Sequence, residues 1–248
     1  METYGSDIYT EPDADPDGLA NLGPLRPLAG IWESVIGVDD HPVGPGSDAD
    51  DASIAAGTQR NVFVERYELQ PIDPQTNGPQ LFYGLRYHVH IVKPGEVETF
   101  HDQVGYWLWE PAQRMVTQTI AMPRAIVALA AGNAEPDATE FELTATLGSQ
   151  TYGVLSNPFL DAAFRTTSFR IRVTVNADDT WSYEEDAVLE LPDRDEPFHH
   201  IDRNTLRRVA APAPNPLRAA PPGRADQAVP STGGLNIGGL RNERGNLL

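Results

Sequence analysis

The chain has 248 residues, of which 18 are basic and 36 acidic, and it contains no cysteine. A formal net charge of −18 argues against binding to nucleic acid or to an anionic membrane surface, because phosphate groups attract basic protein surfaces. The lack of cysteine excludes disulfides, iron–sulfur clusters and thiolate ligation of zinc or heme. No run approaches the roughly 18 apolar residues of a membrane span. The N-terminus also has no signal-peptide pattern, so we expect a cytoplasmic protein.

Composition divides the chain into three parts. Residues 1–23 are acidic without one basic residue, and they are predicted to be a disordered tail. Residues 210–248 are rich in Pro, Ala and Gly and are predicted to be a second disordered tail. The segment 24–209 is long enough to bury a sizeable core and is predicted to be one domain.

The first half of this domain contains runs typical of β-strands. Val62–Leu69 is one run, and Leu81–Val92 is another with a clear period of two. Val104–Trp109 and Met115–Ala121 are predicted to form a hairpin around Glu110-Pro-Ala-Gln. In the second run, one face carries Leu81, Tyr83, Leu85, Tyr87, Val89 and Ile91, and the other carries Phe82, Arg86, His88 and His90.

The second half continues in the same way. Phe141–Leu147 is a further predicted strand. Thr166–Val175 and Thr180–Leu191 are predicted to pair across Asn176-Ala-Asp-Asp, whose residues tolerate tight turns. Phe198–Val209 is the last predicted strand.

Helix is sparse in this pattern. Asn157–Phe164 is predicted to be a short helix, because Pro158 suits a first helical turn and Ser156 or Asn157 can cap it. Ala125–Ala131 fits either a short helix or a buried strand. About ten strands with one short helix predict an all-β fold, a single antiparallel up-and-down β-barrel. A jelly roll is the alternative, and closure into a barrel removes exposed strand edges.

A histidine pair on the last predicted strand is the first candidate site. Neighbouring residues on a strand face opposite sides, so only one of His199 and His200 can point into a barrel. A neutral imidazole is a good ligand for heme iron. The alternative interpretation is that one histidine is exposed and the other is hydrogen-bonded within the protein.

His88 and His90 form the second candidate site. Residues at i and i+2 on a strand share a face, a geometry that the metal sites of cupin barrels use. His101 would have to supply a third ligand across a turn. The alternative interpretation is a polar outer strand face beside Arg86.

Four segments, taken in order, resemble the nitrobindin-like heme-binding β-barrels, which are related in fold to fatty-acid-binding proteins and lipocalins. These segments are Gly30-Ile-Trp32, Gly105-Tyr-Trp107, Ile120–Arg124 and His200–Leu206. The resemblance covers roughly residues 24–209. Ser34 and Ile36 stand where the family has its later glycines.

The resemblance implies ferric heme b held by a histidine on the last strand, reaction with nitric oxide, and isomerisation of peroxynitrite to nitrate. His200 is the expected iron ligand because Ile201 follows it, as an aliphatic residue follows the family histidine, and His199 is the alternative. Trp32 is expected near the barrel closure and is counted with the cofactor-binding residues, although it would serve the fold more than the chemistry. Arg124 is expected at the rim, where it would pair with a heme propionate.

Two other functions remain open from the sequence. The first is a carrier of a fatty acid or another apolar small molecule, with Arg124 or Arg86 holding the carboxylate. The second is a cupin-like enzyme with one iron, manganese or zinc ion on His88 and His90. Each of these functions expects a small-molecule ligand. The sequence leaves the oligomeric state open, with a homodimer as one option.

Overall fold

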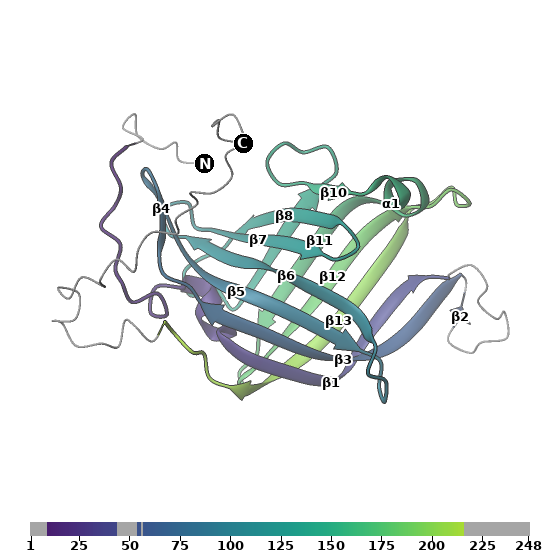
Figure 1. The fold of residues 1–248 in the computed structure, drawn as a ribbon, viewed down its shortest axis with the longest axis horizontal. Helices are drawn as coiled ribbons and strands as arrows, with labels where there is room; N and C mark the ends of the chain where they lie inside the picture. Colours follow the sequence, from purple (N-terminus) through teal and green to yellow (C-terminus); the bar gives the residue numbers. More distant parts are fainter. Residues whose placement is uncertain (1–8, 44–53, 56, 216–248) are drawn as a thin grey trace, which may run out of the picture. The chain divides into compact units, whose positions relative to one another are not determined.

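Ten antiparallel strands close into a barrel in the computed structural model, which describes residues 9–43, 54–55 and 57–215 (Figure 1). Of the two predicted tails, residues 1–8 and 216–248 lie outside the described residues, whereas residues 9–23 and 210–215 are described. The ring consists of β1 (Gly30–Pro42), β3 (Thr58–Pro71), β5 (Gln80–Val92), β6 (Thr99–Glu110), β7 (Met115–Met122), β8 (Ile126–Asn133), β9 (Glu140–Thr146), β11 (Arg165–Val175), β12 (Thr180–Glu190) and β13 (Phe198–Ala210).

The order of the strands around the barrel follows the chain closely. Strand β1 pairs with both β3 and β13, and the pairing of β3 with β5 completes the ring. Between β5 and β13 each ring strand lies beside the next ring strand in sequence. This order confirms the predicted up-and-down barrel and rules out the jelly roll.

Five shorter elements complete the described part of the chain: η1 (Gly23–Leu28), β2 (Ile54–Ala55), β4 (Gln75–Asn77), β10 (Val154–Ser156) and α1 (Pro158–Ala163). Helix α1 is the predicted one. The Asn157 side chain accepts hydrogen bonds from the backbone N–H groups of Phe159 and Leu160, so Asn157 is its N-cap. In the described part of the chain, no helix is long and apolar enough to cross a membrane.

The segment Ala125–Ala131, for which the sequence allowed either a helix or a strand, lies almost entirely in strand β8. Its residues pair with β7 on one side and with β10 on the other, so its backbone groups are satisfied as a strand. The 3-10 turn η1, which precedes the first strand, was not predicted from the sequence.

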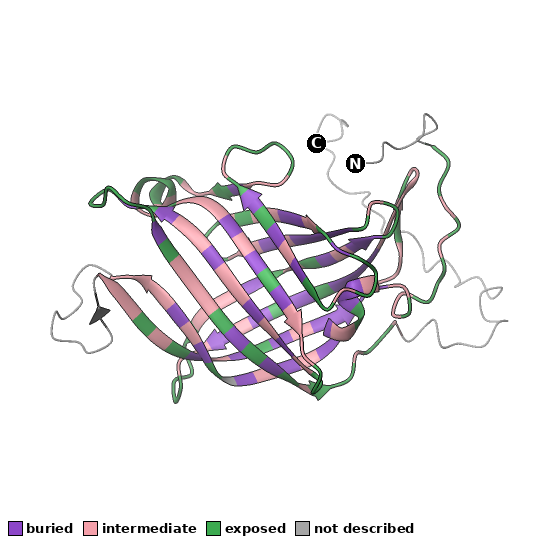
Figure 2. Cartoon of the chain, turned by 180° about the vertical axis from the view of Figure 1, so that it is seen from behind, coloured by how far each residue is buried: buried purple, intermediate pink, exposed green. Residues whose placement is uncertain are grey.

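Buried residues alternate with more exposed ones along the strands of the barrel (Figure 2). On β5, Tyr83, Leu85 and Tyr87 are buried, whereas His88 is exposed on the opposite face. The predicted period-two pattern of this strand is therefore confirmed. It shows that odd-numbered residues of β5 face the interior.

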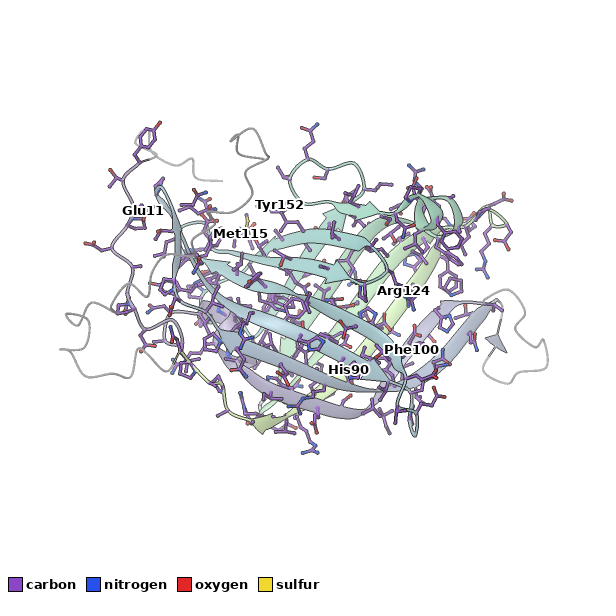
Figure 3. The ribbon with its side chains drawn as sticks, viewed as in Figure 1. Glu11, His90, Phe100, Met115, Arg124 and Tyr152 are labelled. Carbon is purple, nitrogen blue, oxygen red and sulfur yellow. The ribbon has the colours of Figure 1, made fainter. Side chains whose placement is uncertain are left out.

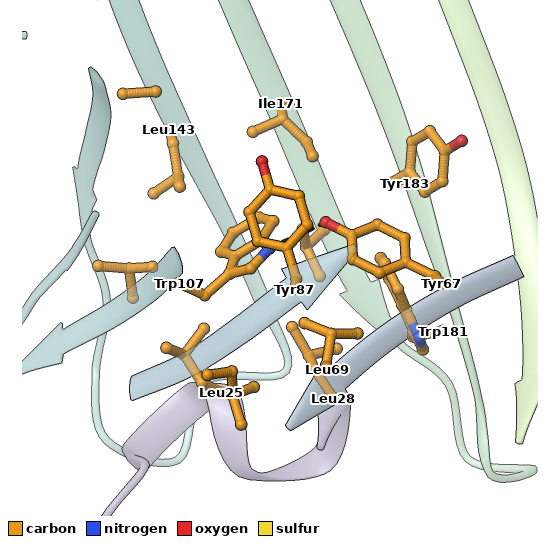
Figure 4. Packing of buried hydrophobic residues seen from close by; sticks show 14 of the residues in the cluster. Leu25, Leu28, Tyr67, Leu69, Tyr87, Trp107, Leu143, Ile171, Trp181 and Tyr183 are labelled. Atoms are coloured by element: carbon orange, nitrogen blue, oxygen red, sulfur yellow. Dashed lines mark hydrogen bonds between the residues drawn. The ribbon is translucent and has the colours of Figure 1, made fainter. Parts of the chain in front are cut away.

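An aromatic core fills the end of the barrel near η1 (Figure 4). Trp32 is 1% exposed, and its ring lies edge-on to Trp181 with 6.2 Å between ring centroids. The Trp32 Nε1–H donates a 2.7 Å hydrogen bond to the carbonyl oxygen of Leu28 at the end of η1. The guanidinium of Arg208 lies 4.1 Å from the Trp32 ring centroid. Trp32 thus ties η1, β1 and β13 together.

The glycine two residues before this tryptophan has a steric role. Gly30 has a φ of 141°, a backbone conformation that other residues rarely adopt. A Cβ atom there would lie 2.7 Å from the guanidinium of Arg208 and 2.8 Å from the carbonyl oxygen of Ala210. The Gly-x-Trp opening is therefore explained by barrel closure.

Candidate functional site

A cavity of about 690 Å³ lies inside the barrel beyond the aromatic core. This volume is within the range of small-molecule binding sites. Helix α1 borders the cavity through Phe159 and Leu160, and Phe100 and Arg124 lie toward the same end of the barrel (Figure 3). Most of the wall is apolar and includes Phe63, Val89, Ile91, Ile120, Ile126 and Phe169.

The two neighbouring histidines of β13 face opposite sides of the barrel wall. His200 lines the cavity, and its Nε2 lies 2.8 Å from Oδ1 of Asp39 on β1. His199 is on the outer face, where its Nδ1 lies 3.0 Å from Asp186 and its side chain is 57% exposed. The structure therefore places His200, and not His199, at the cavity.

His200 belongs to a compact group of potential metal ligands. One ligand atom from each of Asp39, His200 and Asp202 lies within 4.8 Å of the others. Burial by itself would lower the pKa of His200, but the hydrogen bond to Asp39 and the charge of Asp202 outweigh burial and raise it. These three side chains can thus stabilise a positive charge, either a proton on His200 or a bound cation.

Two further carboxyl groups, those of Glu185 and Glu65, face the cavity beside Asp202. Burial raises the pKa of Glu185 to about 8, and it raises that of Asp202 to about 7. Glu65 also lines the cavity, and burial raises its pKa to about 7. The Tyr183 hydroxyl donates a 2.8 Å hydrogen bond to Glu65, and the Asn204 amide donates another. This half of the wall is rich in carboxyl groups.

Strand β6 brings a different set of polar groups to the cavity. His101 and Gln103 both line it, with 3.3 Å between His101 Nε2 and Gln103 Oε1. Burial lowers the pKa of His101, and the nearby positive charge of Arg124 acts in the same direction. Arg124, which was expected at the rim, lines the cavity from the turn between β7 and β8.

The alternative metal site of three histidines does not form. His88 is exposed and lies 2.8 Å from Asp102, and His90 is close to Thr99 on the same outer face. His101 lines the cavity on the other side of the wall, so the three imidazoles cannot share an ion. Arg86 is also exposed, which confirms the polar outer face that was the alternative interpretation.

Trp32 is not among the residues that line the cavity, and its contacts are those of the aromatic core. The carboxyl groups around His200 were not predicted from the sequence. Asp202 had a usable signal, because a residue two positions after His200 on a strand shares its face. Asp39, Glu65 and Glu185 had none, because each comes from a different strand and meets His200 only when the barrel closes.

A closed antiparallel β-barrel whose largely apolar cavity also carries imidazole and carboxyl groups defines a small-ligand-binding barrel. Residues 21–208 match the family model described as THAP4-like, heme-binding beta-barrel domain. The chain therefore belongs to this family, as the motif resemblance predicted.

Comparison with solved structures agrees on the fold. Rv2717c from M. tuberculosis is similar with a TM-score of 0.51 and 16% sequence identity, over 77% of this chain and 97% of that chain. This likeness shows the shared barrel. A search of curated proteins found no match.

Proposed function

We propose that this barrel binds heme b, that His200 is the iron ligand, and that the protein handles nitrogen-oxide species in the cytoplasm. The observation that carries the proposal is the position of His200. It is the histidine of the last strand that lines an apolar cavity, in a barrel of a heme-binding family. Sequence reasoning favoured the same residue.

The cavity wall suits a porphyrin in three ways. Side chains such as Phe63, Ile120 and Phe169 offer an apolar surface to a macrocycle. The carboxyl groups of Asp39 and Asp202 lie on the His200 side, where a positively charged iron would offset their mutual repulsion. Arg124 supplies a guanidinium for a propionate.

When bound, ferric heme supplies a Lewis-acidic iron that takes up nitric oxide and favours rearrangement of peroxynitrite to nitrate. His200 would hold the iron. Asp39 would orient the imidazole ring of His200 by accepting the hydrogen on Nε2, as carboxylates do for metal-bound histidines. The apolar wall would limit water around the site. The proposed reaction needs no net proton transfer from the protein.

Titration of the purified protein with hemin tests this proposal. We expect a sharp Soret band at one equivalent that is retained in His199→Ala and lost or broadened in His200→Ala. The two variants are matched, because both remove an imidazole from the same strand and only one lines the cavity. Equal hemin binding by both variants would exclude His200 as the ligand.

A carrier of a fatty acid or another apolar small molecule is the second candidate function. The apolar wall and Arg124 at the cavity favour it, since a guanidinium can hold a carboxylate. This function predicts a co-purified lipid, detectable by mass spectrometry of an organic extract, and only the broad spectrum of free hemin on titration. Loss of the lipid in Arg124→Gln, with the lipid retained in Arg86→Gln on the outer face, would support it.

A further inference from the structure

Polar groups are distributed unevenly around the cavity. The carboxyl groups of Asp39, Glu185 and Asp202 come from the neighbouring strands β1, β12 and β13. The cavity-lining groups His101 and Arg124 come from β6 and from the turn after β7. In the ring, β5, β3 and β1 separate β6 from β13 on one side, and β7, β8, β9, β11 and β12 separate them on the other. The two groups therefore stand on different sides of the cavity.

On the β6 side, the hydrogen-bond partners determine which polar side-chain atoms donate and which accept. The Tyr87 hydroxyl is 3.0 Å from the carbonyl oxygen of Thr119, which can only accept, so this hydroxyl donates its hydrogen there. The Tyr87 oxygen then accepts from the Gln103 amide nitrogen at 2.7 Å. The Gln103 carbonyl oxygen is consequently the atom that faces His101 Nε2.

This arrangement selects one tautomer of His101. A carbonyl oxygen accepts only, so Nε2 of His101 carries the hydrogen and donates it to Gln103. In the neutral ring the other nitrogen, Nδ1, then keeps its lone pair. No hydrogen bond to Nδ1 is present among the described residues. Nδ1 of His101 can therefore act as a base.

We infer that His101 accepts the proton of a small, weakly acidic ligand that enters the cavity, and that Arg124 attracts the resulting anion. This inference rests on the proposed function, and it identifies the ligand class as the protonated forms of small inorganic anions. The step balances as a proton transfer: the ligand HX gives its proton to Nδ1, leaving X⁻ and a His101 imidazolium.

The electrostatic surroundings of His101 keep its imidazole neutral, which is the form that can accept a proton. Burial is the largest cause that lowers its pKa, and the charges of Arg124 and His200 lower it further, whereas Gln103 and Asp102 act in the opposite direction. At neutral pH the imidazole is thus held in its basic form. The carboxyl-rich side of the cavity repels an anion, so X⁻ is directed toward the Arg124 side.

Cyanide binding to the hemin-loaded full chain tests the inference, because hydrogen cyanide is a weak acid that must lose its proton to bind ferric iron as an anion. In His101→Leu we expect the association rate constant for cyanide to fall about tenfold or more. Nitric oxide has no proton to give, so its association rate should not change. His90→Leu, on the outer face, is the matched control and should leave both rates unchanged.

Two results would overturn the inference. One is an unchanged cyanide rate, or an equal change for cyanide and nitric oxide, in His101→Leu. The other is a low-spin, six-coordinate ferric spectrum that becomes high-spin in this variant, since His101 would then be a second axial ligand. Nitrogen NMR of the heme-free protein adds an independent readout, in which Nε2 of His101 should carry the hydrogen.

Failure of the proposed function gives a different result. A protein without a Soret band that depends on His200 would not bind heme as proposed, and the role of His101 would fall with it. A normal band that depends on His200, together with unchanged cyanide kinetics, would overturn only the role of His101.

Discussion

Asp39 and His200 are 161 residues apart in sequence, and a 2.8 Å hydrogen bond joins Oδ1 of Asp39 to Nε2 of His200 across the junction of β1 and β13. Asp39 is 3% exposed, so this carboxylate lies in the barrel wall and has little contact with water. The bond places a negative charge directly beside the proposed iron ligand. It links the Gly-x-Trp strand to the histidine strand.

The pair predicts how His200 titrates. Asp39→Asn removes the negative charge, and we expect the pKa of His200 to fall, because burial favours the neutral imidazole and Asp39 opposes that effect. NMR titration of the heme-free protein measures the change. Asp186→Asn is the control, since Asp186 contacts His199 on the outer face. A His200 pKa that stayed the same in Asp39→Asn would contradict the role given to this bond.

The buried carboxyl group of Glu65 predicts a loss of stability with rising pH. Its pKa is raised from 4.5 to about 7 by burial, so its contribution to stability is complete below pH 4.5 and is lost as pH rises through about 7. The difference corresponds to about 3 kcal/mol. Glu65→Gln keeps an acceptor for Tyr183 and Asn204 and cannot ionise.

Urea unfolding at about pH 5 and about pH 8 tests this prediction. The wild-type protein should lose more stability than Glu65→Gln between the two values. Glu68→Gln, on the exposed face of the same strand, serves as a control and should behave like the wild type. A Glu65→Gln variant with the same pH dependence as the wild type would show that Glu65 is not the responsible group.

Trp32 predicts a structural effect separate from ligand binding. In Trp32→Phe the hydrogen bond to the Leu28 carbonyl is lost and the space beside Trp181 is incompletely filled. We expect a loss of about 2 to 4 kcal/mol in the free energy of unfolding, measured with urea. Because Trp32 does not line the cavity, the position of a Soret band should not move. A shifted Soret band with unchanged stability would contradict the structural role given to Trp32.

Asn157 has two roles that a pair of variants can separate. Its Oδ1 caps α1, and its Nδ2 donates a 2.7 Å hydrogen bond to the carbonyl oxygen of Arg124. Asn157→Ala removes both bonds and should cost about 1 kcal/mol. Asn157→Asp keeps the cap and should be more stable than Asn157→Ala in thermal unfolding. Equal losses of stability in the two variants would show that the hydrogen bond to Arg124, and not the cap, provides the stability.

The sequence by itself determined the fold class and the histidine-bearing strand. Alternation in Leu81–Val92 shows which side chains face inward, because side chains on a strand point to opposite faces in turn. The Asn157 cap and Pro158 also determine α1 locally. Both signals are short-range, so they can be read without knowing which strands become neighbours.

Only the tertiary structure decided the composition of the site. His199 and His200 were equivalent by spacing, and the choice between them follows from which face of β13 turns inward. The positions of Asp39, Glu65 and Glu185 relative to His200 depend on barrel closure, which pairs β1 with β13 and β3 with β5. The same closure separates His101 from His88 and His90, because the wall of the barrel lies between their two faces. Contacts between strands distant in sequence are set by the registers of many strand pairs, and no local pattern contains them.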